Sequence, residues 1–226
     1  MKDINWSDRI IDFMTGFRVP GKLPTSVTVL EPWQSREVVA VASLFYQKFY
    51  SDIKQRTLIL GINPGRFGGG QTGIPFTDPV RLLADCGITS PFKPRTELSS
   101  DFIYRMIQAF GGPEVFYQKF YISSVCPVGF TYKGKNLNYY DLPTLQSRIE
   151  KWAPEWMNSQ IDFGLNREVC FCIGEGKNYD FLTNLNQQYN WFKSIIGLPH
   201  PRFIMQYRRK QLDHHIRQYI DAFHSV

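Results

Sequence analysis

The chain has 226 residues, of which 43% are hydrophobic and 20% charged, and its formal net charge is +6. This length favours one domain over residues 1–226, because two domains would each have only a small core. No apolar run approaches the roughly 18 residues of a membrane helix, and the first residues lack the apolar segment of a secretory signal peptide. We therefore expect a cytoplasmic protein, nucleoid-associated if bacterial, that is neither membrane-bound nor secreted.

The cysteines Cys86, Cys126, Cys170 and Cys172 have neither the pattern of a secreted disulfide framework nor the spacing of a common zinc site. We expect reduced, mostly buried thiols, no metal and no cofactor. The net positive charge favours a polyanionic partner only weakly, because many basic proteins bind no polyanion.

The first quarter of the chain predicts an N-terminal wrap, a helix and a buried strand. Residues 1–35 contain three prolines that interrupt any long helix, and we expect them to wrap around the domain. Ser35 is placed to cap a helix that runs to about Tyr50 with an apolar stripe on one face. Residues 56–62 are mostly apolar without alternation, as is typical of a strand covered on both faces of a parallel sheet.

Helices and strands alternate along the rest of the chain. The further predicted helices are a short one capped by Thr77 or Asp78, one from Ser99 or Ser100 to Gly111, and others over about 145–157, 178–188 and 207–223, with a kink or an end at Pro154. The further predicted strands cover 120–125, 168–173 and 192–198. This order predicts an α/β fold, a three-layer α/β/α sandwich around a short, mostly parallel four-stranded sheet.

Ligands of such folds bind beyond the carboxyl ends of the strands, and three of these ends have unusual sequences. Asn63 precedes a glycine-rich loop, Ser124 lies at the end of the strand over 120–125, and His200 follows the strand over 192–198. The glycine-rich loop lacks the lysine of a nucleoside-triphosphate site and the spacing of a dinucleotide site. We interpret it as a loop whose backbone passes close to a different ligand.

The segments Gly61-Ile-Asn-Pro-Gly65, Phe67-Gly68 and Gln71-Thr-Gly-Ile-Pro-Phe76 resemble one motif of a known enzyme family. It is the first active-site motif of the SMUG-type (single-strand-selective monofunctional) uracil-DNA glycosylases, G-M-N-P-G-P-F-G-M-x-Q-T-G-V-P-F. The resemblance implies a uracil-DNA glycosylase-like domain that acts on DNA. Outside the three strand-end motifs it extends only to the order of strands and helices.

By this resemblance, Asn63 holds the water that attacks the sugar C1′, and Phe76 stacks on the extruded base. The pocket for that base would also be lined by Ile62, Gly65, Phe67 and Gln71. The glycines would leave room for the nucleotide. From the residues alone, Asn63 could instead cap a turn, Phe76 could belong to the core and Gln71 could be an exposed loop residue.

The chain departs from the family at Ser124. The family ends its second strand with H-N-L-C-P, whose Asn contacts the uracil edge, whereas this chain has Ser123-Ser124-Val125-Cys126-Pro127. A Ser hydroxyl is shorter than an Asn amide and rotates to donate or accept a hydrogen bond. Ser124 therefore predicts weaker selection for uracil and space for hypoxanthine or xanthine. The alternative is that both serines only bind backbone groups at the strand end.

The family motif H-P-S-P-R corresponds to Leu198-Pro199-His200-Pro201-Arg202. Aligning both prolines places Leu198 at the family His, whereas aligning His-Pro with His-Pro makes His200 the family residue. We prefer His200, because a hydrogen-bond donor to the base O2 is chemically useful there.

The family places a DNA wedge directly after this motif, where intercalating side chains are apolar or planar and cations contact phosphates. The residues predicted to contact DNA are Arg202, Phe203, Ile204 and Met205 in the wedge and Arg208, Arg209 and Lys210 at the phosphates. The alternative is a helix start with an apolar turn in the core and a solvated basic face.

Together these features predict a monomeric, monofunctional DNA glycosylase of base-excision repair that acts on single- or double-stranded DNA. It would extrude uracil, and also hypoxanthine or xanthine where Ser124 permits, and hydrolyse the N-glycosidic bond without a metal or cofactor. Two alternatives remain at this point, namely a hydrolase of free nucleosides or nucleotides and a DNA-binding relative without catalytic activity.

Overall fold

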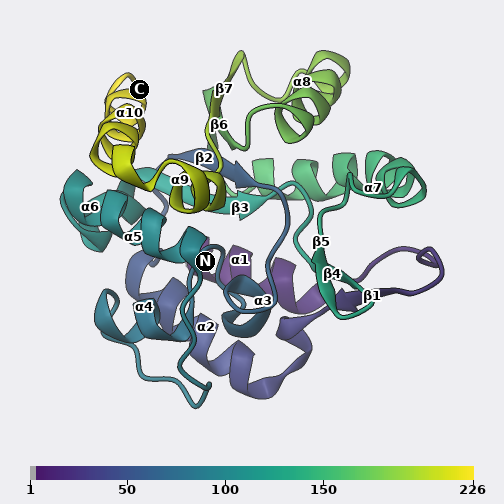
Figure 1. The fold of residues 1–226 in the computed structure, drawn as a ribbon, viewed down its shortest axis with the longest axis horizontal. Coiled ribbons are helices and arrows are strands. Elements are labelled where there is room, and N and C mark those ends of the chain that lie inside the picture. The colour runs from purple at the N-terminus through teal and green to yellow at the C-terminus, as the bar shows by residue number, and fades with distance from the viewer. Residues whose placement is uncertain (1–3) are drawn as a thin grey trace.

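The computed structural model describes residues 4–226 and has a four-stranded parallel sheet at its centre (Figure 1). The strand order is β3-β2-β6-β7, with β3 Phe120–Ser124, β2 Arg56–Gly61, β6 Leu165–Ile173 and β7 Ser194–Leu198. The register pairs Gly61 with Ser124 and Ile173 with Leu198, so the strands end at one common edge. The three unusual strand ends of the sequence therefore meet.

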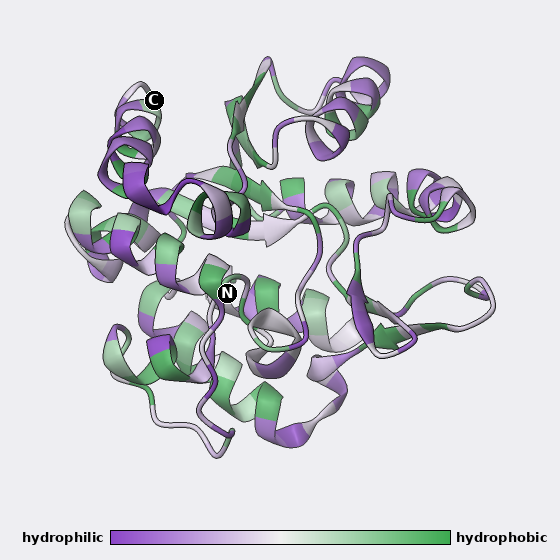
Figure 2. Ribbon diagram, in the orientation of Figure 1, coloured by the Kyte–Doolittle hydropathy of each residue, from purple (hydrophilic) through white to green (hydrophobic). Residues whose placement is uncertain are grey.

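Helices surround this sheet, and Figure 2 shows hydrophobic residues along the central strands and on parts of the surrounding helices. The helices are α1 Trp6–Gly16, α2 Arg36–Phe49, α3 Gly69–Thr72, α4 Pro79–Ala84, α5 Leu98–Phe110, α6 Pro113–Lys119, α7 Pro143–Ile161, α8 Lys177–Tyr189, α9 Pro201–Tyr207 and α10 Leu212–His224. Short 3-10 helices lie at Pro32–Gln34 and Arg209–Gln211.

Successive residues of β3 show that the sheet has a helical layer on each face. The Phe120 ring packs against Phe116 of α6 and Phe223 of α10, with ring centroids 5.0 and 4.8 Å apart. The Tyr121 ring lies on the opposite face, 5.4 Å from Trp6 of α1. The predicted three-layer α/β/α fold is therefore confirmed.

A second sheet, which the sequence did not reveal, lies beside the site. It is antiparallel in the order β1-β4-β5, with β1 Val27–Leu30, β4 Gly129–Tyr132 and β5 Lys135–Leu137. β4 and β5 join through Lys133 and Gly134, whose φ angles of 49° and 72° fit a tight hairpin turn. The outer strand β1 comes from the predicted wrap.

Several predicted elements differ from the structure. Residues 1–35 were predicted only to wrap around the domain, but they include the regular helix α1, because the three prolines of this segment all lie after Gly16. Helix α6 was not predicted. α7 continues through Pro154 to Ile161, since tertiary packing retains the buried proline within the helix. The predicted helix over 207–223 begins only at Leu212, as α10, after the 3-10 helix Arg209–Gln211, and a separate helix, α9, ends at Tyr207.

The structure also shows the state of the cysteines, the hydropathy of the helices and the grouping of possible metal ligands. All four cysteines are free and buried. Within residues 4–226, every helix is too short or too polar to span a bilayer. In the same part of the chain, no three His, Cys, Asp or Glu side chains are grouped to hold a metal ion.

Arg56 at the start of β2 is a fully buried cation that connects the end of α2 to α6. Its guanidinium donates to the Tyr117 carbonyl at 2.8 Å, to the Phe49 carbonyl at 3.3 Å and to the Asp52 carboxylate at 2.8 Å. It also lies over the Tyr50 ring, 4.8 Å from the centroid. A side chain of this kind stabilises the fold only while every partner is present.

We expect Arg56→Ala to lower the free energy of unfolding by about 3–5 kcal/mol, because it leaves buried carbonyls without a donor. Urea unfolding followed by circular dichroism measures the change. Arg105→Ala is the control, since Arg105 is half exposed and its ion pair with Asp101 should contribute less than about 1 kcal/mol. Equal losses in both variants would contradict this role of Arg56.

Candidate functional site

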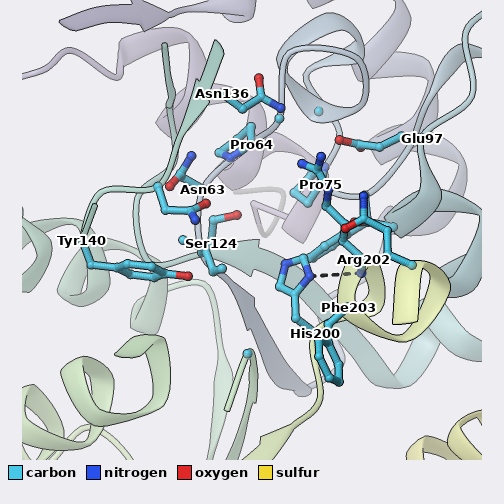
Figure 3. A pocket seen from close by; sticks show the side chains of 18 of the residues that line it. Asn63, Pro64, Pro75, Glu97, Ser124, Asn136, Tyr140, His200, Arg202 and Phe203 are labelled. Carbon is cyan, nitrogen blue, oxygen red and sulfur yellow. Dashed lines mark hydrogen bonds between the residues drawn. The ribbon is translucent and has the colours of Figure 1, made fainter. Parts of the chain in front are cut away.

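A cavity of about 310 Å³ opens at the carboxyl edge of the central sheet, and Figure 3 shows its lining side chains. Its walls come from the segments that follow β2, β6 and β7, from the end of β3, and from the loop after β5. The predicted site residues that it brings together are Ile62, Asn63, Gly65, Phe76, Ser124, His200, Arg202 and Phe203. We call it the base cavity.

The side-chain amide of Asn63 is held by the backbone beyond β5. Its Nδ2 donates to the Leu137 carbonyl at 3.2 Å, and its Oδ1 accepts from the Tyr139 N–H at 3.1 Å. These bonds determine the orientation of the amide and leave one N–H and one lone pair free. Asn63 can therefore orient a water molecule through Oδ1, although an amide is too weak a base to take its proton.

The Phe76 ring lies on the backbone of Gly61, the last residue of β2. A Cβ atom at Gly61 would lie 2.9 Å from the Phe76 ring, so only glycine permits this contact. Phe76 has a φ of 51°, a left-handed conformation that costs a non-glycine residue roughly 1–2 kcal/mol. The turn holds the ring as a flat surface in the base cavity.

The two serines at the end of β3 face opposite sides of the sheet. Ser123 Oγ donates to the side-chain oxygen of Gln160 in α7 at 2.5 Å, which is a side-chain contact and not a contact with backbone groups at the strand end. Ser124 lines the base cavity and lies between Asn63 and His200 in Figure 3. Within residues 4–226 its hydroxyl makes no hydrogen bond, so it is available to a ligand.

His200 caps the amino end of α9 and projects into the base cavity (Figure 3). Its Nδ1 accepts the Arg202 N–H at 3.1 Å, so the neutral ring carries its proton on Nε2. Burial, with a smaller contribution from the Arg202 cation, lowers the pKa of His200 to about 4. His200 is thus a neutral hydrogen-bond donor near pH 7. Leu198, the alternative family position, is buried at the end of β7.

The glycine-rich loop makes room for a side chain that the sequence analysis missed, Glu97. Cβ atoms at Gly65 and Gly68 would collide with its carboxyl oxygens, so glycine at these two positions leaves the space that the Glu97 side chain occupies. Burial and then the Asp78 charge raise the pKa of Glu97 to about 7, against the effect of Arg202. That the glycines also leave room for the nucleotide stays a prediction.

Phe67 and Gln71 do not line the base cavity. The Phe67 ring lies under two guanidinium groups, 4.5 Å from Arg66 Cζ and 4.8 Å from Arg95 Cζ, and borders a neighbouring cavity. Gln71 turns outward and donates to the Lys93 carbonyl at 3.4 Å. The loop folds back through α3, which directs both side chains away from the base cavity.

The predicted wedge is only partly at the surface. Ile204 and Met205 are 0% and 4% exposed, so their assignment to the wedge is wrong. The cause is helix α9, which turns these two side chains into the core and leaves Phe203 and Tyr207 outside, at 46% and 67% exposure. Arg208, Arg209 and Lys210 are exposed beyond α9, and their contact with phosphates stays a prediction.

Three further lining residues come from β5 and from the loop after it, which no motif marked. Asn136, Asn138 and Tyr140 line the base cavity, and Figure 3 shows the Tyr140 hydroxyl directed into it. Burial raises the pKa of Tyr140 to about 12, so its hydroxyl keeps its proton. The only signal in the sequence was a cluster of Asn and Tyr over residues 136–140.

Comparisons with known proteins agree with this geometry. The family model of the uracil DNA glycosylase superfamily matches residues 47–224. The chain is 44% identical to the crystal structure of wild-type Pedobacter heparinus SMUG2, with a TM-score of 0.96 over 99% of this chain and 98% of that one.

Similar sequences include the single-strand selective monofunctional uracil DNA glycosylases of Mus musculus and Rattus norvegicus. The first is 29% identical over 55% of this chain and 48% of its own length, and the second is 30% identical over 43% and 42%. The chain thus spans about half the length of the curated relatives it matches. The predicted resemblance to SMUG-type proteins is confirmed, and the chain belongs to the uracil DNA glycosylase superfamily.

Proposed function

We propose that this protein is a monofunctional DNA glycosylase of base-excision repair. It extrudes uracil or another deaminated base from DNA and hydrolyses its N-glycosidic bond to leave an abasic site. The observation that supports this most directly is the convergence of the oriented Asn63 amide, the Phe76 ring and the His200 imidazole on one cavity. The names of the similar mouse and rat proteins, which are uracil DNA glycosylases, support the same activity.

The reaction needs a positioned water and a stabilised leaving group. The C1′–N bond breaks, the base keeps the electron pair, and the water oxygen bonds to C1′ while its proton passes to solvent. Asn63 Oδ1 holds the water by accepting one of its protons in a hydrogen bond. The neutral His200 donates from Nε2 to the base oxygen on which negative charge develops, a contact that strengthens toward the transition state.

The residues that line the base cavity also favour hydrolysis of the N-glycosidic bond over a lyase reaction. A lyase attacks C1′ with an amine, and in the described part of the chain no lysine lines the base cavity. Phe76 supplies a flat apolar surface for the extruded base. The volume of about 310 Å³ is at the lower end of small-molecule sites and suits one nucleobase.

Ser124 supports a base range wider than uracil. Its hydroxyl rotates to donate or accept, so it fits the carbonyl of a deaminated purine as well as the uracil edge. It is also shorter than the family Asn and leaves more of the cavity to the base. Hypoxanthine and xanthine are therefore proposed as further substrates.

Exposed aromatic rings on α9 support action on DNA. Phe203 and Tyr207 line the mouth of the base cavity, with ring centroids 5.6 Å apart, and the Arg208 guanidinium lies 5.5 Å from the Phe203 centroid. Planar side chains flanked by a cation are typical of residues that fill the gap left by an extruded base. We assign the wedge to Phe203 and Tyr207.

We expect Asn63→Ala to slow single-turnover excision of uracil by about 10²–10⁴-fold, because the water loses its orienting group, while DNA binding is retained. Asn166→Ala is a matched control, since Asn166 also bonds a backbone N–H but lies at the other edge of the sheet. A rate within about threefold of the parent, roughly 0.6 kcal/mol, would remove Asn63 from the mechanism.

We expect Ser124→Asn to narrow the substrate range toward uracil, because the amide is longer and offers a fixed donor and acceptor. The measurement is the relative excision of uracil, hypoxanthine and xanthine from otherwise identical oligonucleotides. Ser123→Ala, which alters only the contact with Gln160, should leave these ratios unchanged. If Ser124→Asn also leaves them unchanged, the base is selected by other groups.

The low pKa of His200 predicts how excision depends on pH. A group of pKa about 4 stays neutral from pH 5 upward, so the saturated rate should not fall as pH rises through 6.5. Glu97 ionises near pH 7 beside the cavity, so the profile is measured in Glu97→Gln as well as in the parent. In Glu97→Gln a fall in rate between about pH 6 and 7 would show that charged imidazolium is the active form.

A further inference from the structure

A second cavity, of about 460 Å³, adjoins the base cavity. The two share Glu97, Ser99, Asn136 and Arg202, so they adjoin at these residues. The other walls of the second cavity come from the glycine-rich loop, the start of α5 and the start of β5. A ligand with one group in the base cavity can therefore continue into the second.

Cations from three separate segments border this second cavity. Arg66, Lys135 and Arg202 line it, and Arg95 reaches the Phe67 ring in its wall. The Phe67 ring holds two of the guanidinium groups within 5 Å, at 4.5 Å for Arg66 and 4.8 Å for Arg95. Arg66 also donates to the Gly134 carbonyl, which fixes its position further.

These four cations have no carboxylate partner within residues 4–226. The ion pairs in that part of the chain use other cations, including Arg81 and Arg105, which both bind Asp101 of α5. Among the described residues, Glu97 is the only acidic one that lines the second cavity, and with a pKa near 7 it has lost much of its charge at neutral pH. The cavity therefore carries a net positive charge and suits an anion.

We propose that the second cavity binds a backbone phosphate of the DNA strand that carries the extruded base, through Arg66, Lys135 and Arg202. This assignment rests on the proposed function, because it requires a DNA strand whose extruded base lies in the base cavity, across the shared wall. When the extruded base of a DNA strand lies in the base cavity, the phosphodiester next to that nucleotide is the anion that reaches the second cavity. Oriented guanidinium groups suit phosphate, since they present several N–H donors in one plane. The DNA path then continues from the base cavity along α9, whose Arg202 lines both cavities.

The test compares two double variants with the same change in charge. Arg66→Gln/Lys135→Gln alters the second cavity, whereas Arg148→Gln/Lys151→Gln alters two cations of α7. Binding of a short unmodified single-stranded oligonucleotide is measured by fluorescence anisotropy over a range of salt concentrations. The first variant should bind more weakly, with a salt slope shallower by up to about 0.7, since the loss of one phosphate contact removes roughly that much. The α7 variant should match the parent.

Two further readouts distinguish a site for a DNA phosphate from a site for a free nucleotide. At subsaturating protein, single-turnover excision of uracil should fall in parallel with the affinity for the oligonucleotide, because these cations contact the strand and not the glycosidic bond. Binding of 2′-deoxyuridine 5′-monophosphate is measured in the parent and the first variant beside that of the oligonucleotide, and the oligonucleotide should be weakened at least as much. Loss of that binding with unchanged oligonucleotide affinity would mean that the cavity holds the phosphate of a free nucleotide, and would overturn the assignment.

Failure of the phosphate site and failure of the proposed function give different results. If the parent excises uracil but the Arg66→Gln/Lys135→Gln variant keeps the parental affinity and salt slope, the second cavity is not a DNA site. If the variant loses affinity as predicted but the parent excises no deaminated base, the phosphate site stands and the proposed activity falls. Matching thermal unfolding of both double variants confirms that each is folded.

Discussion

The site depends on the two hydrogen bonds that connect the Asn63 amide to the backbone beyond β5. The central sheet alone places Asn63 at the end of β2 but leaves its side chain free to rotate. The bonds to Leu137 and Tyr139 select one orientation, and they exist only because the small antiparallel sheet packs β5 beside the glycine-rich loop. Orientation of a group before the substrate binds is what makes a weak contact effective in catalysis.

Electrostatics divide the site into a neutral centre and a positive surround. At the centre, burial keeps His200 neutral with a pKa near 4, so it donates a hydrogen bond without placing a cation beside the sugar. Around it, Arg66, Lys135 and Arg202 border the second cavity. Glu97 lies between the two regions, and its pKa near 7 makes their balance sensitive to pH. The positive rim suits the proposed DNA strand, whereas the imidazole of His200 at the centre of the base cavity is neutral.

The sequence predicted the parts of the structure that local patterns determine. The buried strand before Asn63 and the alternation of strands and helices were sufficient for the three-layer fold, and the family motif indicated Asn63, Phe76 and His200. Glu97 carries no motif, and its importance comes from glycines about 30 residues away in the chain. The sheet β1-β4-β5 was missed because its strands are only three or four residues long and because β1 pairs with β4, which lies far from it in the sequence.

The prediction of the wedge residues was partly wrong for a different reason. Consecutive apolar residues after Arg202 were treated as one exposed cluster, whereas Pro201 begins a helix and distributes them over two faces. Helical spacing places Phe203 and Tyr207 four residues apart on one face and turns Ile204 and Met205 to the other. The sequence contains this helical spacing, but the spacing predicts which side chains are exposed only if the helix is taken to begin at Pro201 and not near Tyr207.

Mass spectrometry of the reaction products tests the proposed hydrolysis most directly. The purified protein is incubated with a uracil-containing single-stranded oligonucleotide, and the masses of the oligonucleotide and of any released base are measured. We expect free uracil and an intact oligonucleotide that has lost the base and gained a hydroxyl group, with no adduct trapped on the protein by borohydride. Unchanged oligonucleotides after incubation with uracil, hypoxanthine and xanthine substrates, or a borohydride-trapped adduct, would contradict a monofunctional glycosylase.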